Sequence, residues 1–98
     1  MNLAYAKKIL LQHKEELEKK FHIIEIGIFG SYVRGEQKKK SDLDVLVEFV
    51  EDSHISLLEY IRLQNLLSDI LGVKVDLVEK KCLKPHIGKR ILEEVIYL

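Results

Sequence analysis

The alternation of short β-rich apolar runs with amphipathic helical stretches most constrains how this chain can fold. Three runs rich in β-branched or aromatic residues are predicted strands: residues 23–29, a second run that begins at about residue 42 and ends at 50, and residues 73–78. Two stretches with apolar residues at helical spacing, and a last one that begins at a proline, are predicted helices: residues 3–20, 57–71 and 85–96. The predicted order is helix, strand, short helical turn, strand, helix, strand, helix.

The lengths of the connections decide how the predicted strands can pair. A helix of about 15 residues separates the second and third strands, so these two can lie parallel, whereas the shorter first connection permits an antiparallel pair. A chain of 98 residues, 47% of them hydrophobic, suits one domain with a single core. We therefore expect one domain over residues 1–98 with an α+β fold, in which a small mixed sheet of about three strands is flanked by helices.

The charge balance, the length of the apolar runs and the cysteine content limit the classes of function that this chain can have. Lys plus Arg and Asp plus Glu number 16 each, and this balance does not favour nonspecific binding of nucleic acid. No apolar run approaches the roughly 20 residues that span a bilayer, and the single cysteine, Cys82, rules out an internal disulfide. We expect a cytoplasmic protein that neither enters a membrane nor binds nucleic acid directly.

Three aspartates are the predicted catalytic and metal-binding residues. Asp42 and Asp44 are two residues apart at the start of the second strand, where the strand period places both carboxylates on one face, about 6 to 7 Å apart at the backbone. Two such carboxylates would repel each other unless one or two Mg²⁺ ions, which prefer oxygen ligands, offset their charge. Asp76 of the third strand could lie beside Asp44, where it would bind metal and accept or steer the proton of an attacking hydroxyl.

A Gly-Ser pair ends the first predicted strand and is the predicted phosphate-binding turn. Glycine lets backbone amides approach a ligand closely, and a serine at a helix start offers a hydroxyl together with N–H groups. We therefore predict that Gly30 and Ser31 bind the phosphates of a nucleotide. Arg34 could add a planar donor fork to these phosphates, or it could form a surface salt bridge instead. Residues 38–40, all lysines, are interpreted as a solvated loop.

The spacing of these residues is more specific than any one of them. Gly30-Ser31, ten intervening residues, Asp42-Leu43-Asp44, and then Asp76 in an apolar strand is the pattern of the DNA polymerase beta-like nucleotidyltransferase superfamily. Two fuller strings resemble its minimal nucleotidyltransferases, the MNT antitoxins that are paired with HEPN toxins: FGSYVRG at residues 29–35 and SDLDVLV at residues 41–47. The resemblance runs over nearly the whole chain.

This resemblance implies a function for the predicted site. It implies that Asp42, Asp44 and Asp76 are the metal and catalytic carboxylates, and that Gly30 and Ser31 hold the nucleotide. It further implies a Mg²⁺-dependent antitoxin enzyme that transfers AMP from ATP to a tyrosine of a cognate HEPN ribonuclease toxin and so neutralises it. A hetero-oligomer with that toxin is the expected assembly. Larger superfamily members append a domain that holds the acceptor, and a chain of this length has no room for one, which favours a protein acceptor.

Two other functions are compatible with the residues. The chain could be a non-catalytic antitoxin that neutralises its partner by binding and covering it, with nucleotide binding reduced to a vestige. Transfer of a nucleotide to a small molecule such as an aminoglycoside is less favoured, because no acceptor domain is present. The four histidines are scattered without metal-ligand spacing, so none of them is a predicted ligand.

Overall fold

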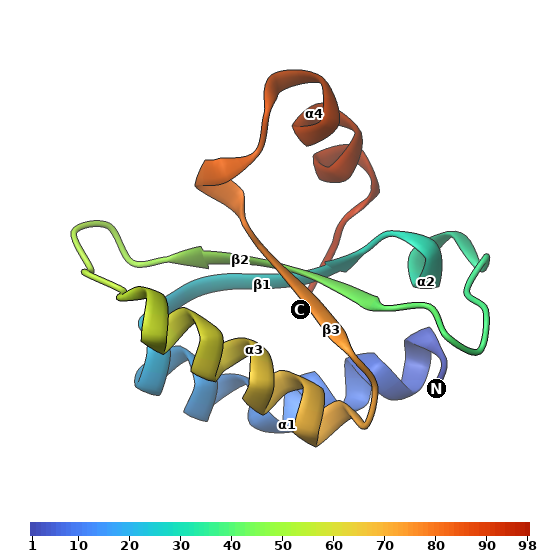
Figure 1. Cartoon of the computed structure of the whole chain (residues 1–98), viewed down its shortest axis with the longest axis horizontal. Coiled ribbons are helices and arrows are strands. Elements are labelled where there is room, and N and C mark those ends of the chain that lie inside the picture. The colour runs from blue at the N-terminus through green and yellow to red at the C-terminus, as the bar shows by residue number, and fades with distance from the viewer.

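The computed structural model describes residues 1–98 and forms a four-stranded mixed sheet with helices on both sides (Figure 1). The helices are α1 (Leu3–Phe21), α2 (Ser31–Arg34), α3 (Leu57–Leu71) and α4 (Pro85–Glu94), with a 3-10 turn, η1 (Lys80–Cys82), before α4. The strands are β1 (Ile23–Phe29), β2 (Leu43–Phe49), β3 (Val75–Glu79) and β4 (Ile96–Tyr97), in the spatial order β3-β2-β1-β4. β1 and β2 are antiparallel, and β2 and β3 are parallel. The predicted α+β fold and both predicted pairings are confirmed.

The two long helices begin and end at residues that suit helix termini. The side chain of Asn2 accepts a hydrogen bond from the Tyr5 N–H at 2.8 Å and caps α1. The hydroxyl of Ser56 accepts one from the Glu59 N–H at 3.1 Å and caps α3. Gly72, in the left-handed conformation at φ 71°, ends α3. None of the four helices combines the length and the apolar character needed to cross a membrane.

The hydrophobic core lies between one face of the sheet and the pair α1 and α3, which run side by side on that face (Figure 1). Alternation along β2 shows the arrangement, because Val45 and Val47 are fully buried in this core while Asp44 and Glu48 are only half-buried on the other side. We call this second side, which carries Asp44, Glu48 and Asp76, the acidic face. Burial of each core valine or leucine contributes about 1.5–3 kcal/mol, so the core holds the backbone that presents the acidic face.

Side chains of α3 cover the exposed edge of β3. The hydroxyl of Ser68 accepts a hydrogen bond from the Val75 N–H at 3.0 Å, and Gln64 Oε1 accepts one from the Leu77 N–H at 3.2 Å. The Tyr60 hydroxyl donates to the Leu77 carbonyl oxygen at 2.6 Å. Unpaired edge strands invite pairing with other chains. These bonds satisfy the edge of β3 and fix its position beside β2.

The C-terminus differs from the sequence prediction. The predicted closing helix through about residue 96 is wrong at its end, because α4 stops at Glu94 and the next residues form β4, a fourth strand antiparallel to β1. Gly27 explains the difference. A Cβ there would lie 2.7 Å from Val95 Cγ2 and 3.0 Å from the Ile96 carbonyl oxygen, so only glycine allows the C-terminal segment to come this close to β1.

Candidate nucleotide-binding site

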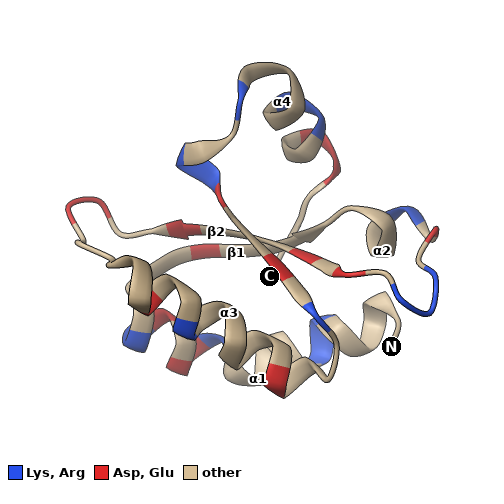
Figure 2. Ribbon diagram, viewed as in Figure 1, with Lys and Arg blue, Asp and Glu red and all other residues tan.

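Asp44 and Asp76 lie side by side on the acidic face. The parallel register of β2 and β3 pairs these two residues directly, and Figure 2 shows acidic segments of both strands where they run together. Asp44 is half-buried and Asp76 is exposed. The structure therefore places Asp76 beside Asp44 as the alternation along the third predicted strand indicated, while the chemical roles of both residues stay predictions.

Asp42 lies just outside the strand on which it was predicted. β2 begins at Leu43, so Asp42 belongs to the preceding connection and the strand period does not fix its direction. Its Oδ2 atom lies 3.9 Å from the Nζ atom of Lys74 in a partly exposed ion pair. Its charge nevertheless acts on Asp44, whose pKa it helps to raise.

Burial, followed by the neighbouring Asp76 and Asp42 carboxylates, raises the pKa of Asp44 to about 6, and Arg34 opposes this shift only in part. The donor set fits a hard divalent cation, because carboxylate oxygens are its preferred ligands and a positive charge would offset the repulsion. No group of three His, Cys, Asp or Glu side chains converges here in the arrangement of a metal site. Metal binding by the three aspartates therefore stays a prediction.

Gly30 brings the backbone against Asp44. Its backbone has φ 84° and ψ −154°, a conformation that residues with a side chain rarely adopt. A Cβ at this position would overlap the Asp44 carboxylate. Its carbonyl oxygen accepts hydrogen bonds from the N–H groups of Val33 and Arg34, at 3.0 and 3.2 Å, and these bonds form the short helix α2. Ser31 begins that helix as predicted, and its half-buried hydroxyl makes no hydrogen bond within the chain.

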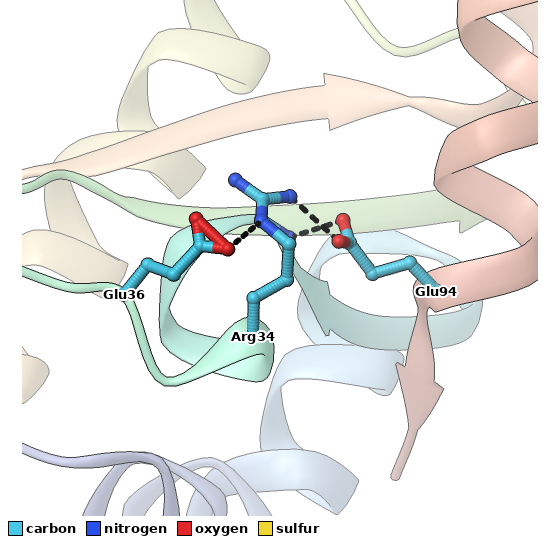
Figure 3. Close-up of polar contacts among 4 residues, drawn as sticks. Arg34, Glu36 and Glu94 are labelled. Carbon is cyan, nitrogen blue, oxygen red and sulfur yellow. Dashed lines mark hydrogen bonds and ion pairs between the residues drawn. The ribbon is translucent and has the colours of Figure 1, made fainter.

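Glu94, near the end of the chain, joins α4 to the Gly-Ser turn (Figure 3). Its Oε2 atom accepts a hydrogen bond from the Gly30 N–H at 2.8 Å, and its Oε1 atom accepts one from Arg34 Nη1 at 2.6 Å. On the other side of the guanidinium, Arg34 Nε lies 3.4 Å from Glu36 Oε1. Burial opposes ionisation of Glu94, but the bonds from Arg34 and Gly30 outweigh it and lower the pKa of Glu94. Sequence reasoning missed Glu94, because the only local signal used for the last helix was the proline at its start, Pro85.

A cleft of about 730 Å³ separates α4 from this part of the sheet. On the sheet side it is lined by Phe29, Gly30, Arg34, Glu36 and Asp44, and on the helix side by Ile87, Arg90, Ile91, Glu93 and Glu94. Three predicted site residues thus share one cleft: Gly30, Arg34 and Asp44. Ser31, Asp42 and Asp76 are adjacent to these residues but do not line the cleft.

Comparison with known proteins decides the family. Residues 10–98 match the model of the nucleotidyltransferase domain. The chain belongs to the nucleotidyltransferase domain family. This nucleotidyltransferase is 49% identical, over 98 residues, to the protein adenylyltransferase MntA of Thermococcus cleftensis, a match that covers 100% of the chain and 97% of the relative. It is 47% identical over 97 residues to a Methanocaldococcus jannaschii protein whose name proposes the same activity, with 98% of the chain and 97% of that protein covered.

Solved structures agree with this assignment. The nucleotidyltransferase superposes with a TM-score of 0.76 and 33% identity on a structure described as a proposed minimal nucleotidyltransferase, covering 100% of this chain and 97% of the other. It shares its fold, at 18% identity and a TM-score of 0.65, with a tri-AMPylated Shewanella oneidensis HEPN toxin in complex with its MNT antitoxin, over 99% of this chain and 71% of the other. The predicted resemblance to minimal nucleotidyltransferases is confirmed.

Proposed function

We propose that this nucleotidyltransferase is an antitoxin that transfers AMP from ATP to a tyrosine hydroxyl of a cognate HEPN-type toxin. The observation that carries the proposal is the position of Asp44, beside Asp76 and against Gly30, on the wall of a cleft of about 730 Å³. Clefts of roughly 300–1,000 Å³ are typical of small-molecule sites. The protein adenylyltransferase named among its relatives supports the same transfer.

In the proposed reaction the acceptor hydroxyl oxygen attacks the α-phosphorus of ATP. A new O–P bond forms, the bond from that phosphorus to the oxygen bridging to the β-phosphate breaks, and pyrophosphate leaves. The hydroxyl proton passes to the carboxylate of Asp76, which is exposed on the acidic face and can release it to water. The Gly30-Ser31 turn holds the phosphates, and the unpaired Ser31 hydroxyl donates to them.

The carboxylates of Asp42, Asp44 and Asp76 would hold Mg²⁺, which supplies positive charge where negative charge develops on the phosphoryl oxygens. The crowding of these carboxylates supports this role, since it raises the pKa of Asp44 to about 6 in the protein alone. The Gly30 backbone lies against the Asp44 side chain and so limits the conformations that its carboxylate can adopt. Asp44 is therefore held where its carboxylate borders the cleft.

Exposed apolar side chains suit a protein acceptor and a hetero-oligomer. Leu57 and Leu58 at the start of α3 are 76% and 58% exposed, and Ile61 one turn later is also exposed. Apolar groups that gather on a surface mark interaction sites more often than chance. Use of ATP and a single free cysteine, Cys82, suit the reducing cytoplasm.

Labelled ATP tests the proposed reaction. The chain and its copurified partner are incubated with Mg²⁺ and ATP labelled at either the α- or the γ-phosphate. Label is expected on the partner from the α-phosphate alone, and Asp42→Asn and Asp44→Asn should abolish it. Transfer of the γ-label would indicate a kinase reaction, and unchanged labelling by both variants would show that the site is elsewhere.

The exposed leucines of α3 also favour the second candidate, an antitoxin that neutralises its partner by covering it. This candidate predicts that Asp44→Asn still protects cells from the toxin. The adenylyl-transfer proposal predicts loss of protection while the variant still copurifies with the toxin. Growth of cells that coexpress the toxin with either form, together with recovery of the complex, separates the two.

A further inference from the structure

One face of α4 lines the cleft on the side opposite Asp44. Five residues of α4 line it, and four of them recur at helical spacing: Ile87, Arg90, Ile91 and Glu94, with Glu93 as the fifth. Ile87 is 60% exposed and Arg90 is exposed, so this part of the wall is accessible. The opposite face of the helix packs differently, since Gly88 is buried against Leu83 and Lys89 lies on that side.

The two arginines of the cleft differ in what they bind. Arg34 contacts two carboxylates, with Nη1 at 2.6 Å from Glu94 and Nε at 3.4 Å from Glu36. Its positive charge is therefore offset within the chain. Arg90 forms no ion pair, although it is near enough to Glu94 to help lower the pKa of that carboxyl.

The charges that line the cleft leave a nucleotide few cationic partners. Four carboxylates and two guanidinium groups line it, so a nucleoside triphosphate would meet more negative than positive charge. A planar guanidinium with free donors is the group best suited to a phosphate in such surroundings. Among the residues that line the cleft, Arg90 alone is a cation without a carboxylate partner.

We propose that Arg90 binds the β- and γ-phosphates of the nucleotide from the α4 wall, opposite Asp44, with Ile87 and Ile91 as the apolar surface beside it. This inference rests on the proposed function, and it assigns to Arg90 the phosphate contact that the sequence suggested for Arg34. The pyrophosphate that leaves in the reaction then stays in contact with α4 while the α-phosphate lies by the aspartates. The last helix thereby becomes part of the substrate site.

Lys89 provides a matched control, because it is the neighbouring cation on the same helix, is also exposed, and faces away from the cleft. Calorimetric titration with Mg²⁺ and a non-hydrolysable ATP analogue is carried out on the wild type, Arg90→Ala, Arg90→Lys and Lys89→Ala. Arg90→Ala should raise Kd about tenfold or more, as expected for loss of one charge-assisted hydrogen bond. The Kd of Arg90→Lys should lie between those of the wild type and Arg90→Ala. Lys89→Ala should change Kd by less than about twofold.

A phosphate contact has a second signature, which a purely structural role of Arg90 would not produce. The loss of affinity in Arg90→Ala should be largest for the triphosphate analogue and smallest for AMP, which lacks the β- and γ-phosphates. Equal Kd values for Arg90→Ala and Lys89→Ala would overturn the assignment of Arg90 even if the wild type binds tightly. A wild type that binds no nucleotide would contradict the proposed function itself, and the inference with it.

Discussion

Asp44 lies against Gly30 so closely that position 30 has no room for a side chain. The two residues come from separate segments, since Gly30 follows β1 and Asp44 belongs to β2, and the pairing of Phe29 with Asp44 in the sheet brings them together. The backbone of the Gly-Ser turn and the central carboxylate of the acidic face thus form one unit. Any change at Gly30 should move Asp44.

Gly30→Ala is therefore expected to abolish nucleotide binding and to lower the free energy of unfolding by about 2 kcal/mol or more, from the overlap and from the strained positive φ. Gly35→Ala is the matched control, because Gly35 also has a positive φ, 72°, but a Cβ there meets nothing within 4 Å. Urea unfolding and nucleotide titration of both variants measure the difference. Equal effects of Gly30→Ala and Gly35→Ala on nucleotide binding would show that the contact between Gly30 and Asp44 is not needed for binding.

Glu94→Gln should destabilise the protein in a pH-dependent way. The pKa of Glu94 is lowered in the folded state, so its ionised form stabilises the fold above the ordinary carboxyl pKa and this contribution is lost as pH falls through the lowered value. At neutral pH the variant should lose about 1 kcal/mol of stability, and the difference from the wild type should shrink on acidification. Denaturant unfolding over a series of pH values measures both.

Glu93→Gln is the control for this prediction, because Glu93 is the adjacent acid on α4 and forms no ion pair. It should leave stability nearly unchanged at every pH. If Glu93→Gln and Glu94→Gln were equally destabilised at neutral pH, the hydrogen bonds of Glu94 with Gly30 and Arg34 would contribute nothing to the stability of the fold.

Asp44→Asn should stabilise the metal-free protein at neutral pH. The pKa of Asp44 is raised from 3.8 to about 6, so the folded state binds more protons than the unfolded state between these values. Stability from this group is present below the lower value and lost as pH rises through the higher one. With solvent screening taken into account, the variant should gain about 1 kcal/mol, or a rise in Tm of about 4–8 °C.

Addition of Mg²⁺ should reverse the order of stability. A cation that binds only the folded wild type raises its Tm with concentration, whereas Asp44→Asn should respond weakly. Scanning fluorimetry over a Mg²⁺ series, in the absence of nucleotide, makes the comparison. Identical Mg²⁺ responses of the two forms would argue against metal binding at Asp44.

Local sequence signals were sufficient for most of the fold. The run from Ile23 to Phe29 was predicted with the bounds that the structure has, because its β-rich residues end at a glycine. The strand period correctly placed Asp76 beside Asp44, since one face of each strand is buried and a slip by one residue would expose the core. Asp42 departed from the prediction because the strand starts one residue after it.

The features that the sequence did not predict depend on contacts between segments that are distant in the chain. Glu94 meets Gly30 across 64 residues of sequence, and no local pattern reports such a pairing. β4 is two residues long and pairs with Gly27 and Ile28, so it gives no periodic signal, and the helix before it was predicted to run into it. The sequence left two interpretations of Arg34, a phosphate contact or a salt bridge, and the structure shows a salt bridge with Glu94.

Transfer of AMP to a partner protein is proposed to depend on the carboxylate of Asp44. Intact-mass spectrometry of the copurified partner, after incubation with Mg²⁺ and ATP, tests it most directly on the wild type, Asp44→Asn and Asp69→Asn, the last an exposed acid on α3 away from the cleft. We expect a partner heavier by whole AMP units with the wild type and with Asp69→Asn, and an unmodified partner with Asp44→Asn. A partner left unmodified by the wild type, or modified equally by Asp44→Asn, would contradict it.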